Sequence, residues 1–332
     1  MNELSSRPRT TRWVAASMAL ALCGCQSTVE DPCQQLTLQL PEQPAIEIAS
    51  AEVSRHNLRA WVAGLTDPVL GGRHAGTPGA RAAAVWLAGE MKRLGLDPGA
   101  AGYCQGFSTY GEAPDFNVVG RLAGNEAAPR ILLSAHYDGQ GRHPNGRIFP
   151  GADDNASGIA ALLEIARLVQ QNRSGTAATG VDWTFIASGA EEIGQLGARE
   201  VLADASLAAA NVTVAINLDM VGRRPGKTPR ETQSAIGYLA LGEGSQTLVS
   251  AIEQAARRAT VDVIALDDFG DAKPAITDAH VFSQRLSTLL LSTALHEDHH
   301  RLSDTPDRLD FDQIARTVTL TLALADIIAH RS

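Results

Sequence analysis

The sequence is poor in cysteine and in long apolar runs, and it has no excess of basic residues. Four cysteines among 332 residues are too few for a fold held together by a disulfide framework. No apolar run reaches the roughly 18–20 residues that a clean membrane-spanning helix needs. The chain has 28 basic and 37 acidic residues, which gives a formal net charge of −9. This charge argues against a nucleic-acid partner, which would need a basic face. The hydrophobic fraction of 44%, with 20% charged residues, indicates a globular protein and favours an enzyme.

The N-terminus is typical of an exported protein. Three arginines among the first twelve residues precede the apolar run 13–22, which is the arrangement of a secretory signal. The sequence Leu22-Cys23-Gly24-Cys25 then resembles the lipobox of bacterial lipoproteins, in which Cys25 would become the first mature residue and carry the lipid. By the same resemblance, Gln26 in place of aspartate favours the outer membrane of a two-membrane cell.

We therefore expect residues 1–24 to be a lipoprotein signal peptide. The protein would be exported and held to a bacterial membrane only through its lipid, on the periplasmic side of the outer membrane if the cell is Gram-negative. The alternative is an ordinary secretory signal that is cut slightly later, with Cys25 incidental.

Export changes what is expected of the remaining cysteines. Once the signal is removed and Cys25 carries lipid, Cys33 and Cys104 remain, and two thiols in an oxidising compartment favour one disulfide. Two unpaired buried thiols are the alternative. Residues 25–50 contain several Gln, Pro and Glu without periodicity, which predicts a lipidated tether and N-terminal arm. Residues 51–332 are predicted to form the single main domain.

Hydrophobic periodicity from residue 51 onward alternates between helix and strand patterns. Helices are expected over residues 56–65, 80–94, 158–170, 247–258 and 311–330. Strands are expected over residues 116–122, 131–135, 182–187, 212–218, 236–241, 261–266 and 288–292. This alternation predicts a three-layer α/β domain, in which a mixed, mostly parallel sheet carries helices on both faces.

Polar segments follow several of the predicted strands. Five such segments cover residues 134–138, 150–158, 188–192, 217–220 and 296–300. Functional residues of open α/β sheets gather outside the carboxyl ends of the strands, so we expect these segments to lie close together. Their imidazoles and carboxylates, without a thiolate, suit Zn²⁺ or a similar divalent ion. Each segment alone is a common structural motif, but carboxylates that converge would repel one another unless metal ions lie between them.

In type, order and approximate spacing, the five segments resemble those of the di-zinc aminopeptidases. That family includes secreted bacterial leucine aminopeptidases and, more distantly, glutamate carboxypeptidase II and glutaminyl cyclase. The resemblance covers residues 136–310, and the helical segment from about residue 51 also fits. It implies the phosphorylase/hydrolase-like zinc-exopeptidase fold and two Zn²⁺ ions. The sequence does not distinguish zinc from cobalt or manganese as the native ion.

The resemblance also implies a role for each matching residue. Five residues would bind metal: His136, Asp154, Glu192, Asp219 and His300. Asp154 would bridge the ions, with His136 and Asp219 on the first and the other two on the second.

Two further residues would act beside the metal ligands. Asp138 would orient the ring of His136, and Glu191 would be the general base. Asp153 would be the neighbour of the bridging residue that does not bind metal. Two ions about 3.5–4 Å apart would lower the pKa of a water, and the free glutamate would pass its proton to the leaving amine.

The activity implied by the resemblance is removal of residues from peptides with a free N-terminus. Two alternatives remain: a glutaminyl-cyclase-like acyltransferase with one zinc, and a metal-free receptor or binding module on the same fold. The full ligand set and the segment Asn155–Gly158 after the bridging residue favour the two-metal hydrolase. The sequence does not identify the side-chain pocket that would select a substrate.

Other signals are weaker. Residues 296–300 match H-E-x-x-H, but the residues downstream lack the third ligand of that helical zinc motif. Residues 222–228 resemble a phosphate-binding loop that is one residue short between its glycines. No role is predicted for the remaining histidines considered, which are His74, His143 and His280.

Overall fold

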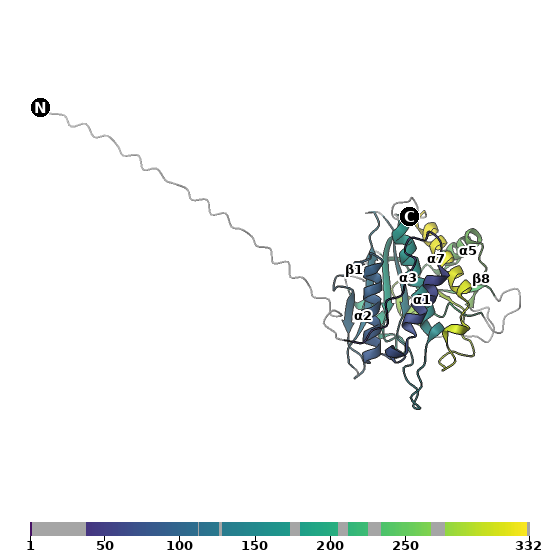
Figure 1. Cartoon of the computed structure of the whole chain (residues 1–332). Helices are drawn as coiled ribbons and strands as arrows, with labels where there is room; N and C mark the ends of the chain where they lie inside the picture. The colour runs from purple at the N-terminus through teal and green to yellow at the C-terminus, as the bar shows by residue number, and fades with distance from the viewer. Residues whose placement is uncertain are drawn as a thin grey trace.

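The computed structural model describes residue 1 and residues 38–111, 113–125, 128–172, 180–204, 212–224, 234–266 and 276–330 (Figure 1). The predicted signal peptide, the lipidated Cys25 and Cys33 lie outside the described residues. Cys104, the predicted partner of Cys33, is buried in a strand near one edge of the sheet. Within the described part of the chain, no helix is long and apolar enough to cross a membrane.

One mixed sheet runs through the centre of the domain. Along it the strands follow the order β1-β3-β5-β4-β6-β9-β7-β8, and β2 also pairs with β3. The strands are β1 Asp97–Pro98, β2 Cys104–Phe107, β3 Asp115–Leu122, β4 Arg130–His136, β5 Asp182–Ser188, β6 Val212–Leu218, β7 Ile236–Leu241, β8 Val263–Ala265 and β9 Thr288–Ser292. Strands β5, β4, β6 and β9 are parallel, whereas β3 and β7 run antiparallel to β5 and β9. The carboxyl ends of the four parallel strands therefore meet at one edge.

Helices cover both faces of this sheet. They are α1 Arg55–Leu65, α2 Pro78–Arg93, α3 Gly158–Gln171, α4 Leu196–Ala203, α5 Ser245–Ala259, α6 Asp278–Phe282 and α7 Phe311–Ala329. Start signals in the sequence fix several of them: the side chains of Ser54, Thr77 and Asp310 accept hydrogen bonds from the first backbone amides of α1, α2 and α7. Three short helical segments also occur in the described residues, at Pro68–Leu70, Ala152–Ser157 and Pro306–Arg308.

Alternating side chains of the central strand β4 divide the core into two parts. Ile131 and Leu133 belong to the large apolar cluster formed with α1, α2, α3, α5 and α7. Leu132 points to the opposite face, where it joins a smaller cluster that includes Val201 of α4 and Phe282 of α6. Figure 1 shows α1, α2, α3 and α7 on the near face of the sheet.

The predicted three-layer α/β fold is confirmed. Strands β6, β7 and β9 occupy the predicted ranges, and the long helices differ from prediction by one or two residues at their ends. The predicted strand over 261–266 is shorter than expected, because β8 pairs only with β7 and over three residues. The sequence analysis missed β1, β2, α4 and α6, which are two to eight residues long and too short to show a clear period.

Candidate metal centre

The carboxyl edge of the parallel strands gathers the polar segments that the sequence analysis selected. His136 is the last residue of β4, and Asp219 directly follows β6. Glu191 and Glu192 lie three and four residues after the end of β5. His300 lies in the turn that follows β9. The register of parallel neighbours brings these strand ends side by side, because His136 is paired with Ser188, the end of β5.

Asp154 lies at the centre of the group. It enters from the short segment before α3, where its backbone departs from helical geometry, and its peptide bond to the next residue is cis. Its Oδ1 atom lies 3.3 Å from Nε2 of His136, whose Nε2 is also 3.6 Å from Oδ1 of Asp219. Its Oδ2 atom lies 3.1 Å from Nε2 of His300, which is also 3.1 Å from Oε2 of Glu192. One carboxylate thus faces two separate sets of ligand atoms.

Two groups of three residues could each hold a metal ion, because the potential ligand atoms within each group all lie within 4.8 Å of one another. The first group is His136, Asp154 and Asp219, and the second is Asp154, His299 and His300. Asp154 is common to both, as a bridging ligand would be. These groups include four residues of the predicted ligand set, and the fifth, Glu192, joins them through its 3.1 Å contact with Nε2 of His300.

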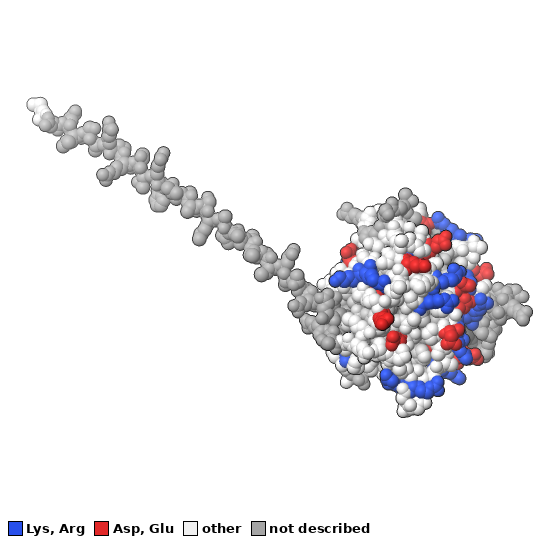
Figure 2. All heavy atoms as spheres, viewed as in Figure 1, with Lys and Arg blue, Asp and Glu red and all other residues white. Residues whose placement is uncertain are grey.

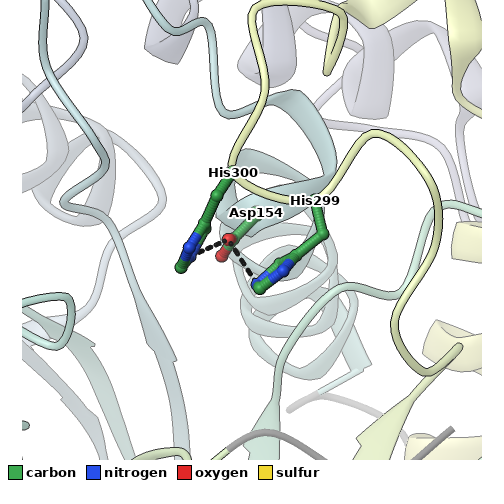
Figure 3. A group of neighbouring side chains, drawn as sticks. All are labelled: Asp154, His299 and His300. Carbon is green, nitrogen blue, oxygen red and sulfur yellow. Dashed lines mark ion pairs between the residues drawn. The ribbon is translucent and has the colours of Figure 1, made fainter.

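His299 is the residue that the sequence analysis missed. Its Nε2 atom lies 3.5 Å from Oδ2 of Asp154, and its ring stacks on His300 with centroids 3.7 Å apart. Figure 3 shows the two imidazoles on either side of the Asp154 carboxylate. Of these two histidines, only His300 also forms an ion pair with Glu192 in the described residues. The doublet of histidines was the available signal, but a sequence does not show that both rings face the same carboxylate.

The electrostatics of the group favour a cation between the carboxylates. Burial by itself would lower the pKa of His136, but Asp138, Asp154 and Asp219 together raise that pKa well above its ordinary value. Hydrogen bonds to Asp154 and Glu192 raise the pKa of His300 to about 10. The imidazoles of His136 and His300 would thus hold a proton unless another positive charge replaced it, whereas burial lowers the pKa of His299.

The residues present fit a divalent metal ion. Oε1 of Glu192 is buried and has no hydrogen-bond partner among the described residues, and Oδ2 of Asp154 is buried with the imidazoles of His299 and His300 beside it. A buried acceptor without a partner costs roughly 1–3 kcal/mol, and more when it is charged. Burial and the charge of Asp154 also raise the pKa of Glu192. A set of imidazole nitrogens and carboxylate oxygens matches the donor preference of zinc.

Asp138 connects the two halves of the site. Its Oδ1 atom lies 3.5 Å from Nδ1 of His136 and accepts a 3.0 Å hydrogen bond from the backbone amide of Glu191. Its Oδ2 atom accepts a 3.1 Å hydrogen bond from the amide of Glu192. The buried Asp138 therefore faces the imidazole of His136 while it also fixes the backbone of Glu191 and Glu192.

Glu191 differs from its neighbour in its contacts. Its Oε1 atom accepts a 3.0 Å hydrogen bond from Nε2 of Gln195, and it forms no ion pair with a histidine in the described residues. Burial, together with Asp278 and other nearby carboxylates, raises the pKa of Glu191 well above its ordinary value. It lines the same cavity of about 170 Å³ as the metal ligands, with Met220 and Ile276 contributing an apolar wall.

The residue beside the bridging aspartate has a different environment. Asp153 accepts a 2.7 Å hydrogen bond from the amide of Gly222, and its Oδ2 atom lies 3.1 Å from Nε2 of His296. Asp304 in turn accepts hydrogen bonds from the amides of Asp153 and Asp154. These contacts anchor the segment that carries Asp154, and burial together with Asp153 raises the pKa of Asp304 to about 6.

The histidines without a predicted role lie elsewhere or act structurally. His280 is in α6, where its Nδ1 atom accepts a hydrogen bond from the amide of Thr277. His143 contacts the ring of Phe149. Residues 297–300 form turns rather than a helix, so the H-E-x-x-H match does not correspond to the helical zinc motif.

The fold and the site define an α/β protein with a candidate metal centre of imidazoles and carboxylates at the carboxyl edge of its sheet. Residues 117–325 match the sequence profile of Peptidase family M28. The chain belongs to this peptidase family, and the resemblance predicted from the sequence is confirmed at that level.

Similar proteins in fungi include peptidases. The chain is 31% identical to a probable zinc metalloprotease of Pyrenophora teres f. teres over 210 residues, which are 57% of this chain and 43% of that protein. It is 24% identical to leucine aminopeptidase 1 of Arthroderma gypseum over 251 residues, which are 70% of this chain and 66% of that protein. The chain thus spans less than two thirds of the length of either relative.

Solved structures share the fold. The LapA aminopeptidase of Legionella pneumophila has a TM-score of 0.65 and 18% identity, covering 88% of this chain and 78% of that one. BSAP, a zinc aminopeptidase from Bacillus subtilis, has a TM-score of 0.65 and 16% identity, covering 83% and 95%. Porphyromonas gingivalis glutaminyl cyclase also has a TM-score of 0.65, with 20% identity, covering 82% and 98%. Proteins of more than one reaction type therefore have this fold, so the fold alone does not identify the reaction.

Proposed function

We propose that this protein is a metal-dependent exopeptidase that removes N-terminal residues from peptides, with two Zn²⁺ ions as its cofactors. The observation that supports this proposal best is the position of Asp154, whose two carboxylate oxygens face two separate sets of ligand atoms. A bridging carboxylate of this kind suits two ions better than one. Membership of Peptidase family M28 supports hydrolysis of peptide bonds.

The ligand atoms divide between the two ions according to their contacts. His136, Asp154 and Asp219 would hold the first ion. Asp154, Glu192 and His300 would hold the second, because His300 reaches both carboxylates. His299 faces only Asp154 of these residues and would stand beside the second ion.

The chain supplies the acid–base chemistry. When bound, the two ions would polarise the scissile carbonyl and lower the pKa of the attacking water. Glu191 would accept a proton from that water and deliver it to the leaving amine, which suits a carboxylate that is not itself a ligand. Burial raises the pKa of Glu191 and so strengthens it as a base. Asp138 would hold His136 and the backbone of Glu191 in fixed relation.

The lining of the cavity suits the N-terminal residue of a peptide. Its carboxylates create a negative field that attracts an ammonium group. Met220 and Ile276 would contact an apolar side chain at the same place. We propose peptides with a free N-terminus as substrates on these grounds.

We also propose that the protein is exported and anchored to a bacterial membrane through lipid on Cys25, on the periplasmic side of the outer membrane if the cell is Gram-negative. A disulfide between Cys33 and Cys104 would tie the N-terminal arm to β2. Peptide mapping of the mature protein without reductant would detect a cross-linked peptide containing both residues. Two separate thiol-containing peptides in that map would contradict the disulfide.

The activity is tested with the protein from Gln26 onward, produced without lipid and loaded with zinc. A panel of aminoacyl chromogenic amides is offered with free and with acetylated amino groups, and Glu191→Gln serves as the control. We expect turnover of the free-amine forms only, with two bound ions. Two bound ions without turnover of any amide would contradict the aminopeptidase activity. Cyclisation of N-terminal glutamine by a protein with one ion would instead support a glutaminyl-cyclase reaction.

A further inference from the structure

A second cavity, of about 490 Å³, lies outside the metal centre and shares none of its lining residues. Leu309 and the ring of Phe311 are buried and form part of its lining. Four arginines also line it: Arg59, Arg223, Arg224 and Arg308. Four guanidinium groups around one cavity are unexpected in a chain whose formal net charge is −9.

Much of the hydrogen-bonding capacity of these arginines is unused. Arg59 lies over the ring of Phe311, with 4.0 Å between Cζ and the ring centroid, and has no hydrogen bond or ion pair in the described residues. Nη1 of Arg223 is buried and has no hydrogen-bond partner among the described residues. Arg308 donates to Asp298 through Nη1, which leaves its other nitrogens available. Each guanidinium carries five N–H donors, so several remain for a ligand.

The aspartates near the cavity are already engaged. Asp298 contacts Arg223 and Arg308, at 2.7 and 2.8 Å. Asp310 caps α7 by accepting hydrogen bonds from the amides of Asp312 and Gln313, and it also contacts Arg224.

Asp312, the last of these acids, forms an ion pair with Arg55, which is not among the residues lining the cavity. Asp298 pairs with Arg223 and Arg308, and Asp310 pairs with Arg224 and Arg316. Arg59 therefore has no carboxylate partner among the described residues. Figure 2 shows basic and acidic side chains interspersed over the face that carries α1 and α7. Ion pairs therefore account for part of the positive charge at the cavity and leave an excess at Arg59.

We propose that this cavity binds a phosphate group. A phosphate offers several oxygen acceptors to guanidinium donors, and arginine contacts such groups with two parallel hydrogen bonds. The apolar residues Leu309 and Phe311 would contact whatever carbon skeleton the phosphate carries. The group could belong to a free phosphate compound or to the headgroup of an anionic phospholipid. The proposal does not depend on the peptidase reaction.

The test uses the zinc-loaded protein from Gln26 onward and two probes. Inorganic phosphate is titrated calorimetrically, and vesicles of phosphatidylcholine with and without phosphatidylglycerol are sedimented with the protein. The variant carries Arg59→Gln and Arg224→Gln. These two arginines are chosen because Arg223 and Arg308 hold Asp298, which directly precedes His299. The control is Arg258→Gln, which removes an exposed arginine that pairs with Asp326 outside the cavity.

We expect the wild-type protein and the control to bind one of the two probes, more weakly as salt rises. The double variant should bind it at least tenfold more weakly, with unchanged zinc content and melting temperature. Binding of inorganic phosphate identifies a free anion, and binding only to phosphatidylglycerol vesicles identifies a lipid headgroup. If the double variant does not fold, Arg59→Gln alone is used, because it breaks no hydrogen bond of the described residues. Binding of neither probe, or equal binding by the variant and the control, overturns the proposal.

Discussion

His300 places its Nε2 atom 3.1 Å from Oε2 of Glu192. The same nitrogen is 3.1 Å from Oδ2 of Asp154, whereas Nε2 of the adjacent His299 is 3.5 Å from that oxygen. The two neighbouring imidazoles are thus not equivalent, because His300 contacts two carboxylates whereas His299 contacts only one among the described residues. This difference is the reason that we propose His300, rather than His299, as a ligand of the second metal ion, and it permits a direct test.

The two histidines are expected to differ in metal content when each is replaced. His300→Ala should lose about one of two zinc ions and nearly all activity, because the remaining ligands no longer complete the second set. His299→Ala should keep both ions. Zinc is counted by mass spectrometry of the dialysed protein. Loss of one ion from His299→Ala, with both kept in His300→Ala, would reverse the assignment.

The two adjacent glutamates give a second matched pair. Glu191→Gln should keep two zinc ions and lower kcat by roughly 10²–10⁴-fold, because only proton transfer is lost. Glu192→Gln should lose zinc from the second set along with its activity. Steady-state kinetics and zinc counts on both variants distinguish the roles. A Glu191→Gln enzyme with normal kcat would show that the base is another group.

Much of this site could be predicted because its residue types follow long, buried strands. The apolar run of β9, Thr288–Ser292, is buried throughout, so its range was predictable, as was the edge at which His136 and Asp219 meet. The position of the His299 ring could not be predicted from the sequence, since it depends on how a turn orients two consecutive histidine side chains. Short elements such as α6 were also missed, because five residues do not complete two helical turns.

Arg73 shows a further limit of sequence patterns. It is 1% exposed, and its guanidinium donates to the backbone oxygens of Leu65, Tyr137, Pro150 and Gly151. All its acceptors are carbonyl groups, which a sequence does not distinguish from any others. Tyr137 lies between two residues of the metal centre, and Gly151 begins the approach to Asp154, so this one side chain joins both segments.

Replacement of Arg73 should therefore destabilise the fold. Arg73→Met would leave four carbonyl oxygens without this donor, and we expect the free energy of unfolding to fall by about 3–5 kcal/mol. Arg73→Lys should lower the free energy of unfolding by less, because an ammonium group can still donate hydrogen bonds to some of these carbonyl oxygens. Urea unfolding measures both. The control is Arg81→Met, which removes a single hydrogen bond to Gly76 and should cost about 1 kcal/mol or less. Equal losses in Arg73→Met and the control would contradict the proposed support.

The last prediction concerns Asp278, a buried carboxyl at the start of α6. Its Oδ2 atom accepts a 2.5 Å hydrogen bond from the hydroxyl of Ser188, and its Oδ1 atom has no hydrogen-bond partner in the part of the chain that the structure describes. Burial raises the pKa of Asp278 to about 7. An unfolded aspartate has a pKa of about 3.9, so the folded protein binds this proton more tightly. The resulting stability is fully present below about pH 4 and is lost as the pH rises through 7.

Asp278→Asn has no carboxyl to deprotonate and should lose this dependence. In protein stripped of metal by a chelator, the free energy of unfolding of the variant relative to wild type should rise by about 3–4 kcal/mol between pH 4 and pH 8. Chemical unfolding across this range measures the difference. The control, Asp262→Asn, changes an exposed aspartate in the same way, and its free energy of unfolding should vary with pH as that of the wild type does. An Asp278→Asn curve that also runs parallel would show that the buried carboxyl is ionised without a stability cost.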